Sequence, residues 1–254
     1  MRPTPLQVLA LAAGWALAGC APAASGGRSP APASRPADKQ TSLRRSAERM
    51  IKAGRGHLAP VYAPLAEQIA ADLHLARKSG VGIDLGSGPG TLIVELCKRT
   101  QLHWINADIN PYFFGPFLAL AEARGVGGRV SAVLADAQNL PFRDDYADVV
   151  VSRGSYHFWP DLRKALAEIY RVLKPGGVAY IGRGFSRNLP LKTAKAIRRR
   201  QGKPMRYDRQ AQAAAFRKIM AALGVTRYRI HMPTVPGGEN VNYGIWIEFH
   251  KPAR

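Results

Sequence analysis

Short apolar runs alternate with longer amphipathic segments through the middle of the chain. Runs such as VGIDLG and ADVVVSR predict buried strands at 81–86, 103–108, 130–136, 147–153 and 178–184. Apolar positions with helical spacing predict helices at 91–99, 113–124 and 161–173, and Lys174-Pro175-Gly176-Gly177 ends the last of these. This alternation predicts right-handed crossovers and a mostly parallel sheet with helices on both faces.

The pattern continues on both sides of this region. Helices are predicted before it at 43–53 and 60–75. Basic helical segments follow it at 191–201 and 208–223, and the last two strands are predicted at 225–232 and 243–250, separated by the loop PTVPGGEN. At 254 residues, the chain is long enough for one substantial core. We therefore predict a single α/β domain.

The N-terminal segment is different in character. Arg2 precedes an apolar stretch from Leu6 to Gly19, which is too short to span a bilayer but typical of a signal-peptide core. It ends in Leu17-Ala18-Gly19-Cys20, which resembles the bacterial lipobox, in which the cysteine is lipidated; the alternative is an Ala-rich leader with a chance cysteine. We predict a lipoprotein-type signal at 1–20 and a flexible Pro/Ala/Ser-rich tether at 21–42.

The charge of the chain is strongly positive and unevenly distributed. Lys and Arg number 37 against 17 Asp and Glu, a net charge of +20. Residues 81–180 are neutral, whereas residues 181–254 carry sixteen basic and three acidic side chains. Such a field attracts anions, although an Arg-rich solvated surface is an equally simple explanation. The second cysteine, Cys97, is predicted to be a buried thiol; no CxxC or Cys/His spacing indicates a metal site.

A glycine-rich turn follows the first predicted strand of the domain. Gly86, Gly88 and Gly90 stand between this strand and the next helix, where glycine allows a tight turn and close approach of a ligand to the backbone. The GxGxG spacing differs from the dinucleotide fingerprint, and no GK[ST] sequence is present. A nucleoside without phosphates suits this turn better than a nucleotide.

Acidic residues occur beside this turn and at the ends of the next two strands. Asp84 precedes the glycines, Asp108 ends the second strand of the region, and Asp136, followed by Ala137, ends the third. A carboxylate at the end of the second strand can accept hydrogen bonds from both hydroxyls of a ribose. The third position can read an adenine amino group through the Asp136 side chain or the neighbouring backbone.

Together, these motifs resemble those of class I S-adenosylmethionine-dependent methyltransferases. The resemblance covers about residues 55–185 and is carried by DLGSGPG, Asp108, ADAQNLPF, DVVVSRGSYHFW and ALAEIYRVLKPGG. Within the class, the sequence is similar to the branch that includes quinone and sterol methyltransferases. It implies a Rossmann-like, seven-stranded, mostly parallel sheet with helices on both faces and an antiparallel last strand, for which GIWIEFHK is the candidate. The methyltransferase domain would span 43–254.

The resemblance also implies a set of residues that bind S-adenosylmethionine. They are Asp84, Gly86, Ser87, Gly88, Gly90, Asp108, Ile109, Asp136, Ala137 and Ser152. The glycines would line the methionine part and the sugar edge, and Asp84 would reach the amino group, often through water. Asp108 would bind the ribose hydroxyls, Ile109 would pack on the adenine, and Asp136 with Ala137 would hold the adenine amino group.

Residues 152–154 would face the methyl group and the acceptor. Methyl transfer is an in-line displacement that requires alignment and exclusion of water, and a thiolate or hydrosulfide acceptor needs no base. A phenol or hydroxyl acceptor needs one, for which Tyr156 and His157 are candidates, although a structural role for His157 is favoured. Arg153 and Arg183 end strands at the expected ligand-binding edge, where they would orient an anionic acceptor or simply be solvated.

Two further segments depart from a minimal enzyme of this class. INPYFFGPF, which follows Asp108, is expected to pack in the core or, less simply, to shape an acceptor pocket. The basic insertion at 184–210 is expected to cover a small-molecule acceptor (a thiol or hydrosulfide, a quinone-like phenol or a metalloid) or to contact an anionic lipid surface.

Two other functions stay open: a non-catalytic S-adenosylmethionine-binding sensor or scaffold, and an RNA methyltransferase, which the absence of an NPPY-type motif disfavours. The leader predicts a membrane-anchored lipoprotein on the periplasmic side. A true start near Met50 would instead leave the protein in the cytoplasm.

Overall fold

The computed structural model describes residues 36–202, 208–238, 241 and 243–253. The predicted signal 1–20, with Cys20, and residues 21–35 of the predicted tether lie outside these ranges. Residues 36–254 form one compact unit by themselves. This unit contains every strand and helix that the structure describes, with its own hydrophobic core.

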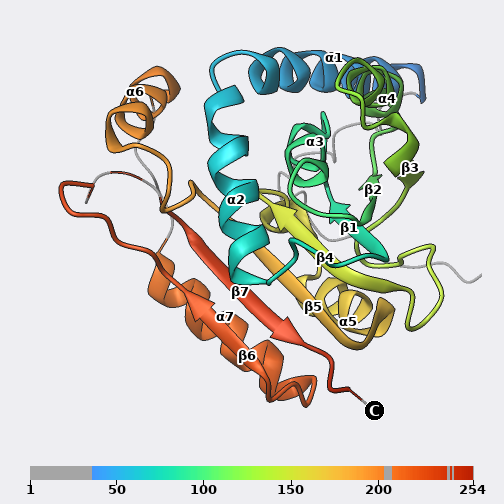
Figure 1. Cartoon of the computed structure of the whole chain (residues 1–254), viewed down its shortest axis with the longest axis vertical. Coiled ribbons are helices and arrows are strands. Elements are labelled where there is room, and N and C mark those ends of the chain that lie inside the picture. Colours follow the sequence, from blue (N-terminus) through green and yellow to red (C-terminus); the bar gives the residue numbers. More distant parts are fainter. Residues whose placement is uncertain (1–35, 203–207, 239–240, 242, 254) are drawn as a thin grey trace, which may run out of the picture. The chain divides into compact units, whose positions relative to one another are not determined.

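A seven-stranded sheet forms the centre of this unit (Figure 1). Its strands are β1 (Val81–Leu85), β2 (His103–Asp108), β3 (Val130–Leu134), β4 (Ala147–Arg153), β5 (Leu173–Arg183), β6 (Tyr228–His231) and β7 (Ile245–His250). Their order is β3-β2-β1-β4-β5-β7-β6, and β7 runs antiparallel to both of its neighbours. The predicted fold class, including the reversed last strand, is confirmed.

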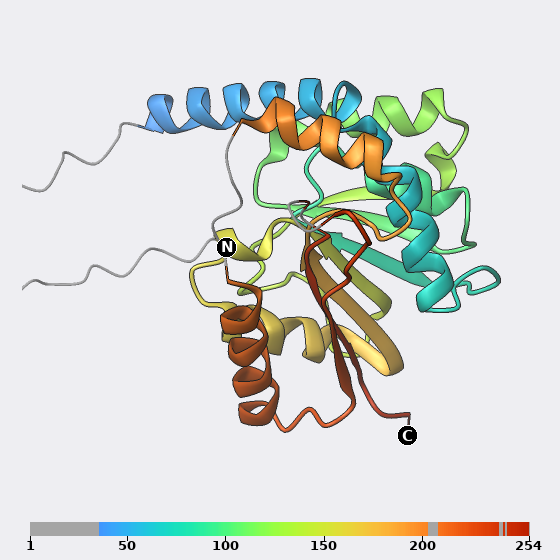
Figure 2. The same cartoon turned by 90° about the vertical axis from the view of Figure 1, so that its left-hand side faces the viewer.

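Helices cover both faces of the sheet. They are α1 (Pro36–Arg55), α2 (Tyr62–Asp72), α3 (Thr91–Cys97), α4 (Phe114–Ala123), α5 (Leu162–Val172), α6 (Leu191–Gln201) and α7 (Arg209–Ala222). Side chains of β4 alternate between the faces: Val150 packs with α5 and α7, while Val149 and Val151 pack with α2, α3 and α4. Both views place α1 and α6 at the end of the unit toward which the parallel strands run (Figure 1, Figure 2).

Two predicted boundaries are wrong. Helix α1 begins at Pro36 rather than at residue 43, so residues 36–42 are helical and are not part of a flexible tether. Proline is well suited to the first turn of a helix, and the carboxylate of Asp38 there complements the helix dipole. At the other boundary, the predicted helix 161–173 ends at Val172, but β5 begins at Leu173 rather than at residue 178, so Lys174-Pro175-Gly176-Gly177 lies inside the strand.

The irregular start of β5 accounts for the second error. Leu173 pairs with Ala147, and the register then shifts before Val149 pairs with Val178. Gly176, at a φ of 79°, takes up the extra chain length, and its N–H donates to the Lys251 carbonyl. The Pro-Gly-Gly sequence therefore marks an irregularity in the strand rather than a loop before it.

The described residues also show the surroundings of Cys97 and bear on a membrane span and a metal site. Cys97 is buried as predicted, and burial raises the pKa of its thiol to about 11. No helix in the described ranges is long and apolar enough to cross a membrane. In the same ranges, no group of three or more His, Cys, Asp or Glu side chains is placed to hold a metal ion.

Candidate active site

The glycine-rich turn joins β1 to α3, and its three glycines have positive φ angles of 68°, 56° and 70°. A Cβ on Gly86 would overlap Ser155, and a Cβ on Gly90 would overlap the Phe117 ring. Gly88 differs, because a Cβ there would meet Met50 and Phe113 only at ordinary contact distances. Two of the glycines are therefore required by packing as well as by backbone conformation.

The side chain of Asp84, at the end of β1 beside the turn, is 2% exposed. Its Oδ2 accepts a hydrogen bond of 2.6 Å from the Ser87 hydroxyl, whereas its Oδ1 is buried with no hydrogen-bond partner among the described residues. Burial raises the pKa of this carboxyl to about 7, helped by the charge of Asp108 and opposed by the Ser87 hydrogen bond and Arg153. An ammonium group at Oδ1 would satisfy the oxygen and favour the ionised form.

The second strand holds the turn through Gly88. Asp108 Oδ2 accepts from the Gly88 N–H at 2.8 Å, and its Oδ1 accepts from the Asn110 N–H at 2.9 Å. Burial raises the pKa of Asp108, and these backbone hydrogen bonds oppose that change. Asn106 Nδ2 donates to the Gly88 carbonyl at 3.0 Å, so β2 binds both backbone groups of this glycine.

Sequence reasoning did not identify Asn106 or Asn110. The signal for Asn106 is present, because it is a polar residue at the centre of the otherwise apolar strand His103–Asp108 and is fully buried. Buried amides are normally hydrogen-bonded, so such a position indicates a specific partner. Which partner it binds follows only from the pairing of Asp84 with Asn106 in the parallel sheet.

The predicted adenine side lies at the ends of β2 and β3. Ile109 and Leu134 are 65% and 59% exposed, and Leu134 pairs with the residue that precedes Ile109. Asp136 is exposed, and its Oδ1 accepts from the Gln138 N–H at 2.9 Å, while Ala137 is buried. Two exposed apolar side chains at neighbouring strand ends offer a surface that a flat ring can cover.

The acceptor side begins at the end of β4. Ser152 is buried, and its hydroxyl lies 2.6 Å from that of Ser155, which in turn donates to the Leu85 carbonyl at 3.0 Å. Ser155 therefore links β1 to β4 and packs against Gly86, a role that the sequence did not reveal. Gly154 has a φ of 75° and open space where a Cβ would lie.

Two of the three candidate catalytic side chains, Tyr156 and His157, contact each other edge to face, with ring centroids 5.9 Å apart. Tyr156 is 3% exposed and packs in the core, with its ring 5.5 Å from that of Phe216. His157 is exposed beside Phe158; partial burial and the nearby charge of Arg183 lower its pKa to about 4. The Arg153 guanidinium lies 5.5 Å from the centre of the Tyr62 ring.

The aromatic segment after Asp108 packs mainly in the core. Phe113 and Phe117 are buried, and Phe117 closes the space above Gly90. Helix α1 lies against the same segment: Asn110 Nδ2 donates to the Leu43 carbonyl at 2.9 Å, and Arg55 donates to the Pro116 carbonyl at 2.9 Å. The first helix therefore covers the loop that holds the turn.

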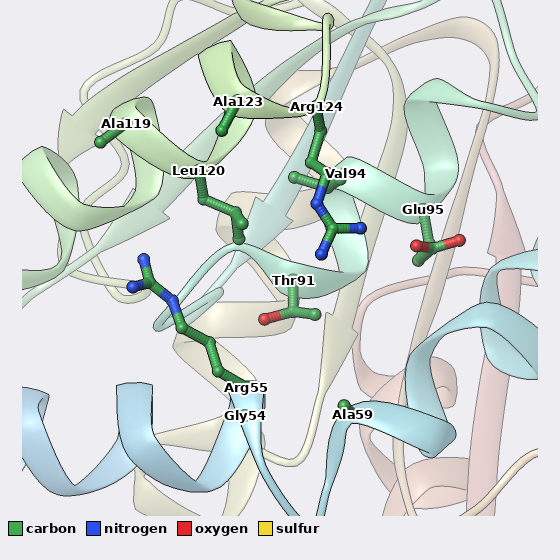
Figure 3. Close-up of a pocket in the computed structure, with 10 residues that line it drawn as sticks. All are labelled: Gly54, Arg55, Ala59, Thr91, Val94, Glu95, Ala119, Leu120, Ala123 and Arg124. Carbon is green, nitrogen blue, oxygen red and sulfur yellow. The ribbon is translucent and has the colours of Figure 1, made fainter.

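A cavity of about 500 Å³ lies at the junction of α1, α3 and α4 (Figure 3). It is lined by Gly54, Arg55, Ala59, Thr91, Val94, Glu95, Ala119, Leu120, Ala123 and Arg124. None of the predicted cofactor or catalytic residues is among them. The cavity is therefore distinct from the predicted site.

Comparison with known proteins decides what kind of domain this is. Residues 83–181 match the family model described as a methyltransferase domain. This part of the chain is therefore similar to methyltransferase domains. The matched residues run from β1 into β5 and include the glycine-rich turn, Asp108 and Asp136. Its fold is that of the class I enzymes, for which S-adenosylmethionine is the cofactor.

Several curated relatives match the same part of this chain. A 2-methyl-6-phytyl-1,4-hydroquinone methyltransferase of Spinacia oleracea is 37% identical over 110 residues, 43% of this chain and 30% of that protein. A demethylmenaquinone methyltransferase of Thermus thermophilus is 39% identical over 113 residues, 42% of this chain and 49% of that protein. The matches thus span less than half of the length of these relatives.

A solved structure extends the likeness over most of this chain. A protein described as a candidate S-adenosyl-L-methionine-dependent methyltransferase of Methanococcus maripaludis is 29% identical, with a TM-score of 0.71, over 83% of this chain and 94% of that one. Geranyl diphosphate C-methyltransferase of Streptomyces coelicolor, 16% identical with a TM-score of 0.55 over 74% of this chain and 75% of that one, shares the fold.

Proposed function

We propose that this protein transfers a methyl group from S-adenosylmethionine to a small-molecule acceptor. The observation that carries the proposal is the buried, unpartnered Oδ1 of Asp84, beside a glycine-rich turn tied to Asp108 through Gly88. An anionic group left unpaired in the interior is costly unless a ligand completes it. A cationic amino group on a nucleoside fits the turn, the acid and the exposed Ile109.

The residues of the turn have separate tasks in this proposal. Asp84 accepts the amino group, and Asp108 accepts the ribose hydroxyls with the lone pairs that its backbone hydrogen bonds leave available. Ile109 and Leu134 cover the adenine. S-adenosylmethionine, when bound, supplies an electrophilic methyl group, and the chain has to align the acceptor with it and exclude water.

The acceptor side favours an anionic nucleophile. Arg153 and Arg183 end neighbouring strands, and the field of Arg183 lowers the pKa of His157. A histidine with a pKa of about 4 is neutral at pH 7 but a weak base, so it gives little help to an unactivated hydroxyl. We therefore propose that the charges of Arg153 and Arg183, rather than a protein base, favour the anionic form of the acceptor. A hydroquinone-like phenol ionised beside these charges is our first choice because of the named relatives; thiols and metalloid anions, which ionise more readily, are the alternatives.

The test is an acceptor panel assayed by formation of S-adenosylhomocysteine, together with calorimetric binding of S-adenosylmethionine. We expect micromolar binding by the parent, loss of binding in Asp84→Asn, and turnover with a short-chain hydroquinone. Asp144→Asn, which changes an exposed carboxylate elsewhere, is the control. Binding without turnover on any acceptor would favour the sensor or scaffold, and failure to bind would contradict the proposal.

We further propose that the protein is exported and anchored on the periplasmic side through Cys20, with the basic segment 184–210 contacting anionic lipid. The support is the Leu17-Ala18-Gly19-Cys20 sequence at the end of an apolar run. Incorporation of labelled lipid in cells should disappear in Cys20→Ala. An unprocessed N-terminus in the soluble fraction would contradict this localisation and favour a start near Met50.

A further inference from the structure

Helices α1 and α6 lie at the same end of the compact unit, beyond the carboxyl ends of the parallel strands (Figure 1, Figure 2). Six Lys and Arg residues occur in α1 against two acidic ones, and α6 has five basic residues and no acidic one. Each helix packs through small or apolar residues: α1 buries Ala47, and α6 buries Ala194 and Ile197. Their charged residues are therefore concentrated on the outer surface.

Most of these basic side chains face solvent without a compensating carboxylate. Eight of them are exposed and make no hydrogen bond or ion pair with another described side chain: Lys39, Arg45, Arg49 and Lys52 of α1 and Lys192, Lys195, Arg199 and Arg200 of α6. Among the described residues, none of the eight lies within ion-pair distance of an acidic group. We call these eight residues the cationic face.

Helix α1 also borders two hollows of a size that suits lipid headgroups. One of about 450 Å³ is lined by Asp38, Thr41, Ser42, Arg45 and Arg49, and one of about 480 Å³ is lined by Arg44, Arg45, Tyr112 and the acidic Glu48 among others. Arginines beside hydroxyl groups are suited to phosphate, which guanidinium groups bind with directed hydrogen bonds. The cationic face therefore has local features for phosphate as well as a general field.

We infer that the cationic face docks on an anionic lipid bilayer and turns the active-site edge toward it, so that the acceptor is a lipid-soluble molecule. The part of this inference that names the acceptor rests on the proposed function. Lipid is favoured over nucleic acid because the apolar run 6–19 and Cys20 precede α1, and the 15 residues between Cys20 and Pro36 reach at most about 50 Å.

The position of α1 connects docking to the site. Asn110, whose N–H binds Asp108, donates its side chain to the Leu43 carbonyl of α1. Met50 of α1 is the side chain nearest to the position of a Cβ on Gly88. A bilayer in contact with the outer surface of α1 is thus one helix away from the predicted cofactor turn.

The first test measures vesicle binding and needs no catalytic activity. A chain that begins at Pro36 retains the whole compact unit and removes the leader. We expect it to co-sediment with phosphatidylglycerol vesicles and not with phosphatidylcholine vesicles, and binding should weaken as salt rises. Changing the four α6 residues of the cationic face to Gln should lower the partition coefficient on the order of 1000-fold, at about 1 kcal/mol for each charge removed, and changing the four of α1 should act similarly.

A matched control separates the contribution of this surface to vesicle binding from the effect of net charge. Arg163, Lys164, Arg217 and Lys218 are exposed on α5 and α7, and their replacement by Gln removes the same four charges. If this control loses as much binding as the α1 and α6 variants, or if those variants bind as tightly as the parent, the docking face is refuted. Tighter, salt-sensitive binding of a 30-nucleotide RNA than of vesicles would overturn the choice of lipid.

The second test concerns the acceptor. With a long-chain hydroquinone in phosphatidylglycerol vesicles, the α1 and α6 variants should lose turnover at least about tenfold, in proportion to lost binding. Turnover of a short-chain hydroquinone in solution should not change. Equal loss on both acceptors would refute a membrane-resident acceptor. Absence of turnover by the parent on either would count against the proposed function, while the vesicle-binding result would still decide the docking face.

Discussion

The cofactor half and the acceptor half of the candidate site are built differently. On the cofactor side, Asp108 and Asn106 bind both backbone groups of Gly88, and packing excludes any side chain at Gly86 or Gly90. On the acceptor side, His157 is exposed and Phe158 is 75% exposed. A ligand common to a whole enzyme class requires a preorganised cradle, whereas the acceptor can be chosen by a few exposed side chains.

The largest effect that would test this contrast is expected at Asp84. Replacement by Asn keeps the shape but removes the charge that would pair with an amino group. We expect the affinity for S-adenosylmethionine to fall by about 100- to 1000-fold, as measured by calorimetry. An affinity within threefold of the parent would show that the unpartnered Oδ1 does not bind the cofactor.

The glycine-rich turn should be sensitive to a single methyl group. In Gly90→Ala the new Cβ overlaps the Phe117 ring, whereas Gly125→Ala has a similar φ of 68° but open space around the Cβ. We expect Gly90→Ala to lower the free energy of unfolding by about 2–3 kcal/mol more than Gly125→Ala, measured by urea denaturation. Equal losses would mean that backbone strain alone, and not packing, requires glycine at 90.

The stability of the ligand-free protein should depend on the ionisation of Asp84. Its pKa of about 7 lies above the ordinary value of 3.8, so the folded state holds this proton more tightly than the unfolded state. The stabilisation of the folded state by this protonated carboxyl is fully present below about pH 4 and is lost as the pH rises through about 7. Between pH 5 and pH 8 we expect the free energy of unfolding to fall by about 2–3 kcal/mol through this carboxyl.

Asp84→Asn should remove this part of the pH dependence and be more stable than the parent at pH 8. Urea unfolding of both proteins at the two pH values measures the difference. Parallel pH profiles for parent and variant would indicate that Asp84 is already ionised in the folded state.

The smallest effect is expected on the acceptor side, at His157. With a pKa of about 4, its ring carries no charge between pH 6 and pH 8, and it is a poor general base. We expect His157→Gln to lower kcat less than about fivefold and to leave the pH profile of kcat unchanged in this range, whereas a true general base contributes about 100-fold or more. A larger loss with a shifted profile would place a catalytic proton transfer at His157.

The sequence predicts the cofactor half far better than the acceptor half. Asp84, the glycines and Asp108 follow one another at strand ends, so their nearness comes from a local strand-turn-helix unit and one neighbouring strand. Asn106 was recognisable as an anomaly within its strand, but its partner was not. Ser155, by contrast, donates a hydrogen bond to the carbonyl of Leu85, which lies 70 residues earlier in the chain. The sequence around Ser155 contains no signal of this bond.

By itself, the sequence determined the order of the strands along the chain and the glycine-rich turn, which depend on periodicity and on residues close together in the chain. The reversed last strand was implied by the resemblance to class I methyltransferases and not by periodicity. Only the tertiary structure showed that Tyr156 packs in the core, that α1 lies over the loop after Asp108, and that α1 and α6 bring their charges to one end. These relations depend on contacts between distant segments, and the packing of the whole sheet decides them.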